Sequence, residues 1–204
     1  MLKSIAIFCG SSPGSDDKII QATYETGAFL AQKQRTLVYG GGKVGLMGKV
    51  AQGALDKKGH VIGVIPHFLK QKEVHHKGLS KLLLVNTMHE RKLRMHQLSD
   101  GVIMLPGGFG TFEEFFEMLT WTQLGLHQKP MGILNVNGFY DALIQMFDQM
   151  VANRLLKVES KEMVLVEGSI DKLLEKMESY AGYGVPKWMD WNQTQVNHIT
   201  NNGS

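Results

Sequence analysis

Several features are scarce or missing in this sequence, and each absence narrows its function. The 204-residue chain has one cysteine, Cys9, and five prolines. A single cysteine excludes an internal disulfide and is typical of a reducing cytoplasm, and without a second cysteine we expect no structural zinc site. No apolar run reaches the length of a membrane span, and residues 1–8 enter a strand-like run without signal-peptide architecture. We therefore expect a cytoplasmic protein with no membrane partner.

The net charge of the chain is also small. The formal net charge is only +3, with no basic run longer than a few residues, which is too small an excess to indicate nucleic acid as a partner. With 43% hydrophobic and 20% charged residues, the chain is typical of one α/β domain with a sizeable core. We assign that domain to residues 1–180. Residues 181–204 show no period, and we expect a tail that is partly disordered or docked on a subunit through Trp188 and Trp191.

Strand-like and helix-like segments alternate along the chain, with glycine-rich turns between them. Strands are expected at residues 4–9, 36–39, 60–65, 82–85, 101–105, 129–134 and 163–166. Helices are expected at residues 16–34, from about 48 to 58, and at 87–98, 115–121, 139–152 and 169–180. Repeated βα units predict an α/β fold, a Rossmann-like doubly wound parallel sheet with helices on both faces. In such folds ligands bind outside the C-terminal ends of the strands.

The most informative stretch is residues 106–114, which read Pro-Gly-Gly-Phe-Gly-Thr-Phe-Glu-Glu. A glycine turn between a buried strand and a helix aims free backbone N–H groups and a helix N-terminus at an anion. The three glycines also let the backbone approach a ligand closely. A purely structural alternative is a capping box, in which Thr111 caps the helix and Glu114 reaches back to it. That alternative leaves the glycines unexplained.

Two further glycine turns follow strands, at residues 10–12 and 40–42. In a parallel sheet all three turns would lie along one edge and could surround one nucleotide. Residues 40–45 formally match the dinucleotide fingerprint Gly-x-Gly-x-x-Gly, but the next strand ends Ile65-Pro66-His67, without the acidic residue that binds a ribose. A Walker A loop also fails, because Lys43 stands where its first glycine belongs.

The helix at residues 87–98, opened by a Thr87…Glu90 capping box, places Met88, Arg91, Met95 and Leu98 on one face. An unpaired guanidinium on this apolar stripe would be costly. Arg91 therefore either extends to the surface along the helix edge, or pairs with Glu114 or with a substrate phosphate. Lys92 and Arg94 point elsewhere, and we expect both to be solvated.

The Thr-Met-His-Glu-Arg-Lys segment at residues 87–92, together with residues 106–114, resembles the Lonely Guy family, whose signature is a Pro-Gly-Gly-x-Gly-Thr-x-x-Glu motif preceded by a Met-x-x-Arg-Lys helix. The likeness extends from about Ile5 to Glu178. It implies a phosphoribohydrolase that cleaves the N-glycosidic bond of cytokinin riboside 5′-monophosphates, often accepts AMP, needs no cofactor and is usually a homodimer.

By position in that resemblance, Arg91 and Glu114 match the catalytic pair. The positions expected to bind substrate are Gly10, Ser11, Gly41, Gly42, Glu73, Met88, Lys92, Gly107, Gly108, Phe109, Gly110, Thr111, Glu113 and Thr120. Residues 74–77, Val-His-His-Lys, depart from the family's Thr-Gly-rich segment, which leaves the base preference open. Since hydrolysis at an anomeric carbon passes through an oxocarbenium-like state, we expect Glu114 to face the ribose and handle the water, while Arg91 orients it and favours its ionised form.

Three alternatives stand beside this interpretation. Proteins of the family have often been labelled lysine decarboxylases, which would need pyridoxal phosphate on a lysine; neither Lys43 nor Lys92 has an obvious partner for the pyridinium. A nucleotide-binding sensor without catalysis would share the fold, but would not need the Arg91–Glu114 pair. A metal could bind His75-His76, yet adjacent histidines in a polar stretch are usually solvated, and we expect no metal.

Overall fold

The computed structural model describes residues 1–70 and 75–182, and these form an alternating α/β structure. The strands are β1 (Ser4–Phe8), β2 (Thr36–Tyr39), β3 (Val61–Pro66), β4 (Lys81–Val85), β5 (Gly101–Met104), β6 (Met131–Leu134) and β7 (Val164–Glu167). The helices are α1 (Asp17–Gln32), α2 (Gly45–Asp56), α3 (His67–Lys70), α4 (Met88–Gln97), α5 (Phe109–Gln123), α6 (Asp141–Ala152), α7 (Val158–Glu162) and α8 (Ile170–Glu178), with a 3₁₀ turn, η1 (Val136–Gly138), after β6.

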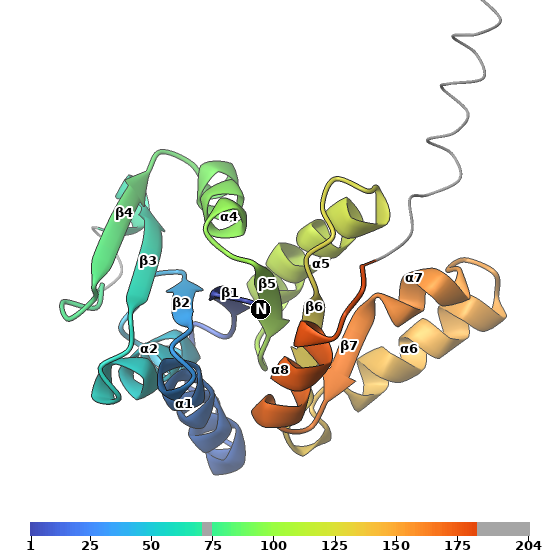
Figure 1. Ribbon diagram of the computed structural model, residues 1–204, viewed down its shortest axis with the longest axis horizontal. Coiled ribbons are helices and arrows are strands. Elements are labelled where there is room, and N and C mark those ends of the chain that lie inside the picture. Colours follow the sequence, from blue (N-terminus) through green and yellow to red (C-terminus); the bar gives the residue numbers. More distant parts are fainter. Residues whose placement is uncertain (71–74, 183–204) are drawn as a thin grey trace, which may run out of the picture.

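The strands form one seven-stranded sheet in the order β4-β3-β2-β1-β5-β6-β7, and every neighbouring pair is parallel (Figure 1). The chain builds the sheet outward from β1 to β4, crosses back to pair β5 with β1, and then builds outward in the other direction. This confirms the predicted doubly wound fold. The strand order reverses between β1 and β5, which is where such folds bind ligands.

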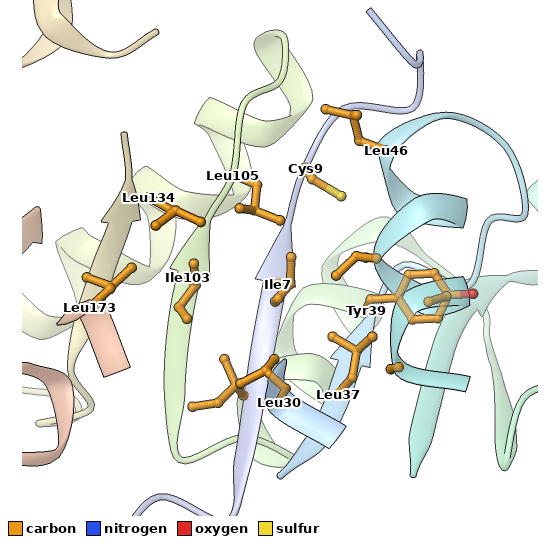
Figure 2. Close-up of a cluster of buried hydrophobic side chains, with 14 of the residues drawn as sticks. Ile7, Cys9, Leu30, Leu37, Tyr39, Leu46, Ile103, Leu105, Leu134 and Leu173 are labelled. Atoms are coloured by element: carbon orange, nitrogen blue, oxygen red, sulfur yellow. The ribbon is translucent and has the colours of Figure 1, made fainter. Parts of the chain in front are cut away.

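Alternate side chains of the central strands enter two separate cores. Ile5 and Ile7 of β1 pack in a core with residues of α1, α2 and α8 (Figure 2), whereas Ala6 and Phe8 pack in a core with residues of α4, α5 and α6. A parallel sheet covered on both faces needs apolar side chains on both, which is why these strands read as continuous apolar runs. Helices on both faces, as predicted, enclose the sheet.

The Thr87…Glu90 capping box at the start of α4 forms with one change of partner. The Thr87 hydroxyl accepts the Glu90 N–H at 3.0 Å, while the Glu90 carboxylate accepts the N–H of Asn86 at 2.7 Å, one residue before the expected donor. The cap fixes where α4 begins. It therefore also fixes the helical phase of the residues that follow, including Arg91.

The structural alternative for residues 111–114, a capping box of Thr111 with Glu114, does not form. Helix α5 begins at Phe109 with Gly108 as its N-cap, and the Thr111 N–H donates to the Gly108 carbonyl at 3.0 Å. Thr111 is buried in the first turn, so it cannot cap the helix. Packing of this turn against the end of the sheet overrides the low helix propensity of Gly110. As a result the helix N-terminus lies directly at the glycine turn.

Two predictions lie outside the described residues: the role of Glu73 and the structure of the tail from residue 183 onward. Among the residues that are described, none of the helices is both long and apolar enough to span a membrane.

Candidate active site

The glycine turns after β1 and β5 meet at the switch point. The Gly10 N–H donates to the Pro106 carbonyl at 3.0 Å, and the Gly10 carbonyl accepts the Met47 N–H from α2 at 3.3 Å. A Cβ atom built on Gly107 would lie 2.8 Å from the Gly10 nitrogen and 2.1 Å from the Thr111 hydroxyl. Only glycine fits at position 107, because the two turns touch there.

The turn after β2 holds Arg91. The Nη2 atom of Arg91 donates to the Gly40 carbonyl at 3.2 Å, and a Cβ atom on Gly40 would lie 1.8 Å from Nη2. The next two glycines, both predicted to bind substrate, are tied to a neighbouring segment: the Gly41 carbonyl accepts the His76 N–H at 3.2 Å, and Gly42 bridges to His75. This turn therefore supports the arginine with one residue and residues 75–76 with the others.

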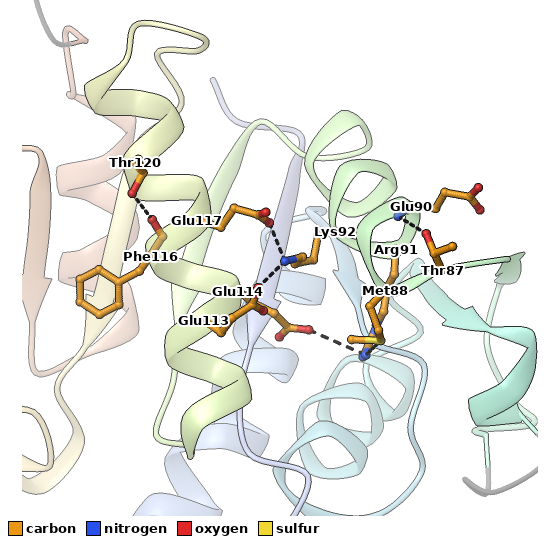
Figure 3. A network of polar contacts seen from close by, with 10 residues as sticks. All are labelled: Thr87, Met88, Glu90, Arg91, Lys92, Glu113, Glu114, Phe116, Glu117 and Thr120. Carbon is orange, nitrogen blue, oxygen red and sulfur yellow. Dashed lines mark hydrogen bonds and ion pairs between the residues drawn. The ribbon is translucent and has the colours of Figure 1, made fainter.

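Arg91 and Glu114 face each other at the centre of the site (Figure 3). Arg91 Nη1 lies 3.8 Å from Glu114 Oε1, and the two side chains are 7% and 13% exposed. The prediction that Arg91 pairs with Glu114 is confirmed. The gap is nevertheless wider than the roughly 2.7–2.9 Å of a charge-assisted hydrogen bond, and no group in residues 1–70 or 75–182 donates a hydrogen bond to this carboxylate. The pair is therefore buried but open, meaning that no close hydrogen bond joins its two members.

The environment of Glu114 makes ionisation of its carboxyl less favourable than in a free glutamate. Burial raises the pKa of the carboxyl above its ordinary value; Arg91 and Lys92 oppose this, and the negative charges of Glu113 and Glu117 add to it. A carboxyl whose pKa is moved toward neutrality by burial and neighbouring charge is characteristic of acid–base sites. This carboxyl can exchange a proton or polarise a water molecule.

Lys92 is not solvated, and that prediction is wrong. Its side chain is 9% exposed and its ammonium contacts the carboxylates of Glu113 and Glu117, the latter at 2.9 Å. Burial alone would lower the pKa of Lys92, but its bonds to Glu113 and Glu117 raise it, so the amine is held protonated. The pattern of α4 alone could not show this, because the partners lie on α5.

Glu117 is the residue of this cluster that the sequence analysis missed. It lies one helical turn after Glu113, and residues four apart share a helix face. This spacing was the available signal. Together Glu113, Glu114 and Glu117 of α5 face Arg91 and Lys92 of α4, which are adjacent in sequence.

The N-terminus of α5 is bare. Cβ atoms built on Gly108 and Gly110 would meet nothing within 4 Å, and the Phe109 side chain is 96% exposed. Packing within the described chain thus does not require glycine at either position. The first N–H groups of the helix, together with its dipole, are available to an anion.

Three other residues that were predicted to bind substrate lie at the edge of the Arg91–Glu114 site or away from it. Met88 is 36% exposed, and its sulfur accepts a long contact from Arg91 Nη1 at 3.8 Å. Ser11 packs its backbone against the start of α2, where a Cβ atom on Gly45 would lie 2.0 Å from its carbonyl. Thr120 donates its hydroxyl to the Phe116 carbonyl at 2.7 Å and lines a groove between α5 and α6, so this chain does not bring it to the Arg91–Glu114 pair.

Cys9 lies under the site at the end of β1. Burial, reinforced by the nearby negative charge of Glu114, raises the pKa of its thiol far above the ordinary value, with Arg91 opposing. A thiol held neutral in this way is a poor nucleophile. Packing accounts for Cys9, which lies in the core of the sheet. Within the described residues, three histidine, cysteine or acidic side chains do not gather anywhere as metal ligands would.

Comparison with known proteins identifies the family. Residues 47–177 match the model of a family described as possible lysine decarboxylase. The probable cytokinin riboside 5′-monophosphate phosphoribohydrolase LOGL1 of Oryza sativa subsp. japonica is 44% identical over 176 residues, covering 86% of this chain and 79% of that protein. The cytokinin riboside 5′-monophosphate phosphoribohydrolase LOG2 of Arabidopsis thaliana is 40% identical over 189 residues, covering 93% and 87%. The chain belongs to the Lonely Guy family.

More distant solved structures share the fold with this Lonely Guy protein. The molybdenum cofactor binding protein of Rippkaea orientalis superposes with a TM-score of 0.65 at 22% identity, covering 88% of this chain and 97% of that one. The DNA processing protein A of Streptococcus pneumoniae superposes with a TM-score of 0.55 at 12% identity, covering 85% and 61%. At these identities the likeness concerns the fold alone. The relatives at 40–44% identity are what connect the chain to the Lonely Guy family.

Proposed function

We propose that this protein is a nucleoside 5′-monophosphate phosphoribohydrolase, which cleaves the N-glycosidic bond of adenosine 5′-monophosphates, N6-substituted ones included, and releases the free base and ribose 5-phosphate. The observation that carries the proposal is the buried, open Arg91–Glu114 pair at the switch point, beside the bare N-terminus of α5. The relatives at 40–44% identity bear the name of this reaction.

The 5′-phosphate would bind at the start of α5. The first N–H groups of a helix lack an acceptor within it, and the helix dipole favours a dianion at this end. Gly108 and Gly110 leave space for the phosphate to approach the backbone. Fixing the phosphate fixes the attached ribose, which converts the attack of water into a step of defined geometry.

The glycosidic carbon would face Glu114. As the bond from C1′ to the base nitrogen breaks, positive charge develops on the ribose ring. The ionised Glu114 carboxylate stabilises that charge and accepts a proton from the attacking water, whose hydroxyl adds to C1′ while the departing base nitrogen takes up a proton. Arg91 is held by its hydrogen bond to the Gly40 carbonyl. It orients the carboxylate from 3.8 Å, without a close hydrogen bond to it.

Lysine decarboxylation, which the family description suggests, fits these residues poorly. That chemistry needs pyridoxal phosphate bound to a lysine as a Schiff base, and hence an amine that can lose its proton. Of the two lysines considered, Lys92 lies beside the Arg91–Glu114 pair, and its ammonium is held by two carboxylates that raise its pKa. We therefore assign no cofactor to the reaction.

The proposal extends to AMP as a substrate, to a homodimer and to the cytoplasm. An apolar groove between α5 and α6 supports the dimer. It is lined on α5 and α6 by Phe116, Leu119, Phe147 and Met150, and Met146 beside it on α6 is 47% exposed. Exposed apolar surface of this kind is typical of interfaces between subunits. A single, buried cysteine fits a reducing compartment.

The test is incubation of the purified protein with AMP and with isopentenyladenosine monophosphate, following free base by chromatography. We expect base release that is abolished in Glu114→Gln and retained in Glu175→Gln, which changes an exposed glutamate of α8. The ratio of the two rates reports the preferred base. If neither nucleotide is cleaved although both bind, the protein is a nucleotide sensor and the proposal fails.

A further inference from the structure

The ion cluster around Lys92 has no role in the reaction described above. Lys92 lies between α4 and α5, and its ammonium contacts Glu113 and Glu117, with the Glu117 contact at 2.9 Å (Figure 3). Its side chain is 9% exposed, and that of Glu117 is 25% exposed. Burying a charge in this way is costly unless it is paired, so the two carboxylates account for the burial of Lys92.

We infer that Glu117 is a positioning residue: with Glu113 it holds the Lys92 ammonium, which fixes α4 against α5 and keeps the neighbouring Arg91–Glu114 pair open to the substrate. The kinetic side of this inference rests on the proposed function. The geometric side concerns only the two helices and the charge around Glu114.

Two sets of ion pairs join α4 and α5, and they differ in how closely the charged groups approach each other. Arg91 and Lys92 are consecutive on α4, and Glu114 lies between Glu113 and Glu117 on α5. The Lys92 link is closed by ion contacts, whereas the Arg91 link stands at 3.8 Å. Arg91 is also drawn toward β2 by the Gly40 carbonyl. Without the Lys92 link, α4 can shift until Arg91 reaches the roughly 2.8 Å distance of a charge-assisted hydrogen bond and masks the carboxylate.

The cluster also sets the charge that Glu114 experiences. The groups that face this carboxyl are Arg91 and Lys92 from α4, Glu113 and Glu117 from α5, and Cys9, which directly follows β1. Cys9 is neutral because its pKa is far above the ordinary value. Removal of the Glu117 charge therefore lowers the pKa of Glu114, and removal of the Lys92 charge raises it.

The resemblance to the family suggested instead that Lys92 contacts the nucleotide. In the structure its ammonium is already occupied by two carboxylates, and the bare start of α5 offers the anion site. The two interpretations differ in what they predict. A phosphate ligand acts mainly on KM, whereas a positioning link acts on kcat and on the pH profile.

The test compares Glu117→Gln, Glu117→Asp and Lys92→Met in the full-length protein. The carboxyl titrations are followed by NMR of ¹³C-labelled glutamate, with the Glu114 signal assigned through Glu114→Gln. We expect the pKa of Glu114 to fall in Glu117→Gln and to rise in Lys92→Met. The pKa of Glu114 should also fall in Glu117→Asp, which keeps the charge but shortens the side chain that holds Lys92, because Arg91 can then close on the carboxylate. Lys176→Met breaks the exposed Lys176–Glu167 pair far from the site and serves as a control for loss of a lysine charge.

The kinetic expectation is a fall in kcat of roughly tenfold in all three variants, since small misplacements of reacting groups are costly, with KM for AMP changed less than threefold. The acid limb of the kcat profile should move to lower pH in Glu117→Gln and to higher pH in Lys92→Met. A Lys92→Met variant with a KM raised more than tenfold, beside Glu117 variants with wild-type kcat and pH profile, would overturn the inference and make Lys92 a substrate ligand.

The experiment still tests this inference if the proposed function fails. Should the wild-type protein release no base, the NMR titrations alone decide: a pKa of Glu114 that falls in the charge-retaining Glu117→Asp variant sustains the link, and an unchanged pKa in that variant refutes it. If Lys92→Met does not fold, the two Glu117 variants retain the lysine and still separate charge from geometry.

Discussion

Two carboxylates at opposite ends of β5 have opposite surroundings. Asp100 immediately precedes the strand, and its Oδ2 accepts hydrogen bonds from the Lys3 N–H at 2.8 Å, the Ser4 N–H at 3.0 Å and the Ser4 hydroxyl at 3.1 Å. Glu114 follows the strand on α5 and has one cation at 3.8 Å and no hydrogen bond from the described chain. At the N-terminal edge of the sheet the polar group is satisfied. At the C-terminal edge it is left for a ligand.

The pKa values of the two groups move in opposite directions. Partial burial would raise the pKa of Asp100, but its hydrogen bonds from Lys3 and Ser4 lower it, whereas burial raises that of Glu114. By linkage, Asp100 contributes stability above its unfolded-state pKa and loses it as pH falls through its folded pKa. Glu114 does the reverse, because its ionised form is disfavoured on folding. One carboxylate stabilises the fold at neutral pH, and the other costs stability there in order to be reactive.

The largest expected effect is that of Glu114→Gln. Loss of a general acid or base typically lowers kcat by about 10²–10⁴-fold. The same change removes a buried carboxylate but leaves the buried Arg91 guanidinium without its partner, which is costly. We therefore expect the melting temperature of the variant to gain on that of the wild type as pH rises, without exceeding it at every pH. Base release and thermal unfolding measured on one preparation check both halves. A variant that kept its kcat, or that lost activity only by unfolding, would remove the contrast with Asp100.

The glycines of the turn after β5 provide the second test. Gly110→Ala adds a Cβ atom in open space and improves helix propensity, so we expect stability to rise by about 0.5–1 kcal/mol while KM for AMP rises roughly tenfold, because the methyl group faces the anion site. Gly107→Ala instead meets the Thr111 hydroxyl at 2.1 Å and the Gly10 nitrogen at 2.8 Å, and should destabilise by about 1–3 kcal/mol. Denaturant titrations together with KM measurements distinguish the effects of the two variants. Equal losses of stability in both variants would contradict the conclusion that Gly110, at the start of α5, faces open space.

The fold itself could be predicted from the sequence because its signals are local. The apolar runs, the glycine turns and the 3.6-residue period of α4 are each read within a few residues, and together they predict a parallel sheet with sites at one edge. The burial of Arg91 was also predictable, since a charged residue on an apolar stripe must find a partner. That partner, Glu114, could be named because both motifs were present.

What the sequence could not reveal depends on how two helices pack. Lys92 lies beside the apolar stripe of α4 and is buried only because α5 brings Glu113 and Glu117 to it. The start of α5 was misplaced because Gly108 and Gly110 read as loop, whereas contact with the turn after β1 begins the helix at Phe109. Local propensity is overridden where tertiary contacts converge, and here they converge on the site.

A smaller effect is expected from Asp100→Ala. Its hydrogen bonds join the start of β1 to the loop before β5, and because the group is exposed to solvent we expect a loss of only about 1 kcal/mol. The kcat should be unchanged, since the sheet separates this residue from the site. Urea unfolding at neutral pH with a parallel activity assay tests this. A loss of activity without a loss of stability would show that the two ends of β5 are not independent.

The smallest effect, and the sharpest contrast, lies in how these stability differences depend on pH. The wild-type protein should exceed Asp100→Ala in unfolding free energy only above the unfolded-state pKa of aspartate, near 3.9, with the difference vanishing as pH falls through the lowered folded pKa of Asp100. Glu114→Gln should gain stability relative to the wild type as pH rises through the raised folded pKa of Glu114, by about 1.4 kcal/mol for each unit by which that pKa is raised. The two differences therefore change with pH in opposite directions, because one carboxylate is stabilised by the fold in its ionised form and the other is not. Urea unfolding from about pH 2 to pH 8 measures both, because the Asp100 difference changes below its unfolded-state pKa and the Glu114 difference above that of glutamate. Curves that change in the same direction would mean that Glu114 is satisfied in the folded protein as Asp100 is, and that the 3.8 Å gap to Arg91 is not an open position.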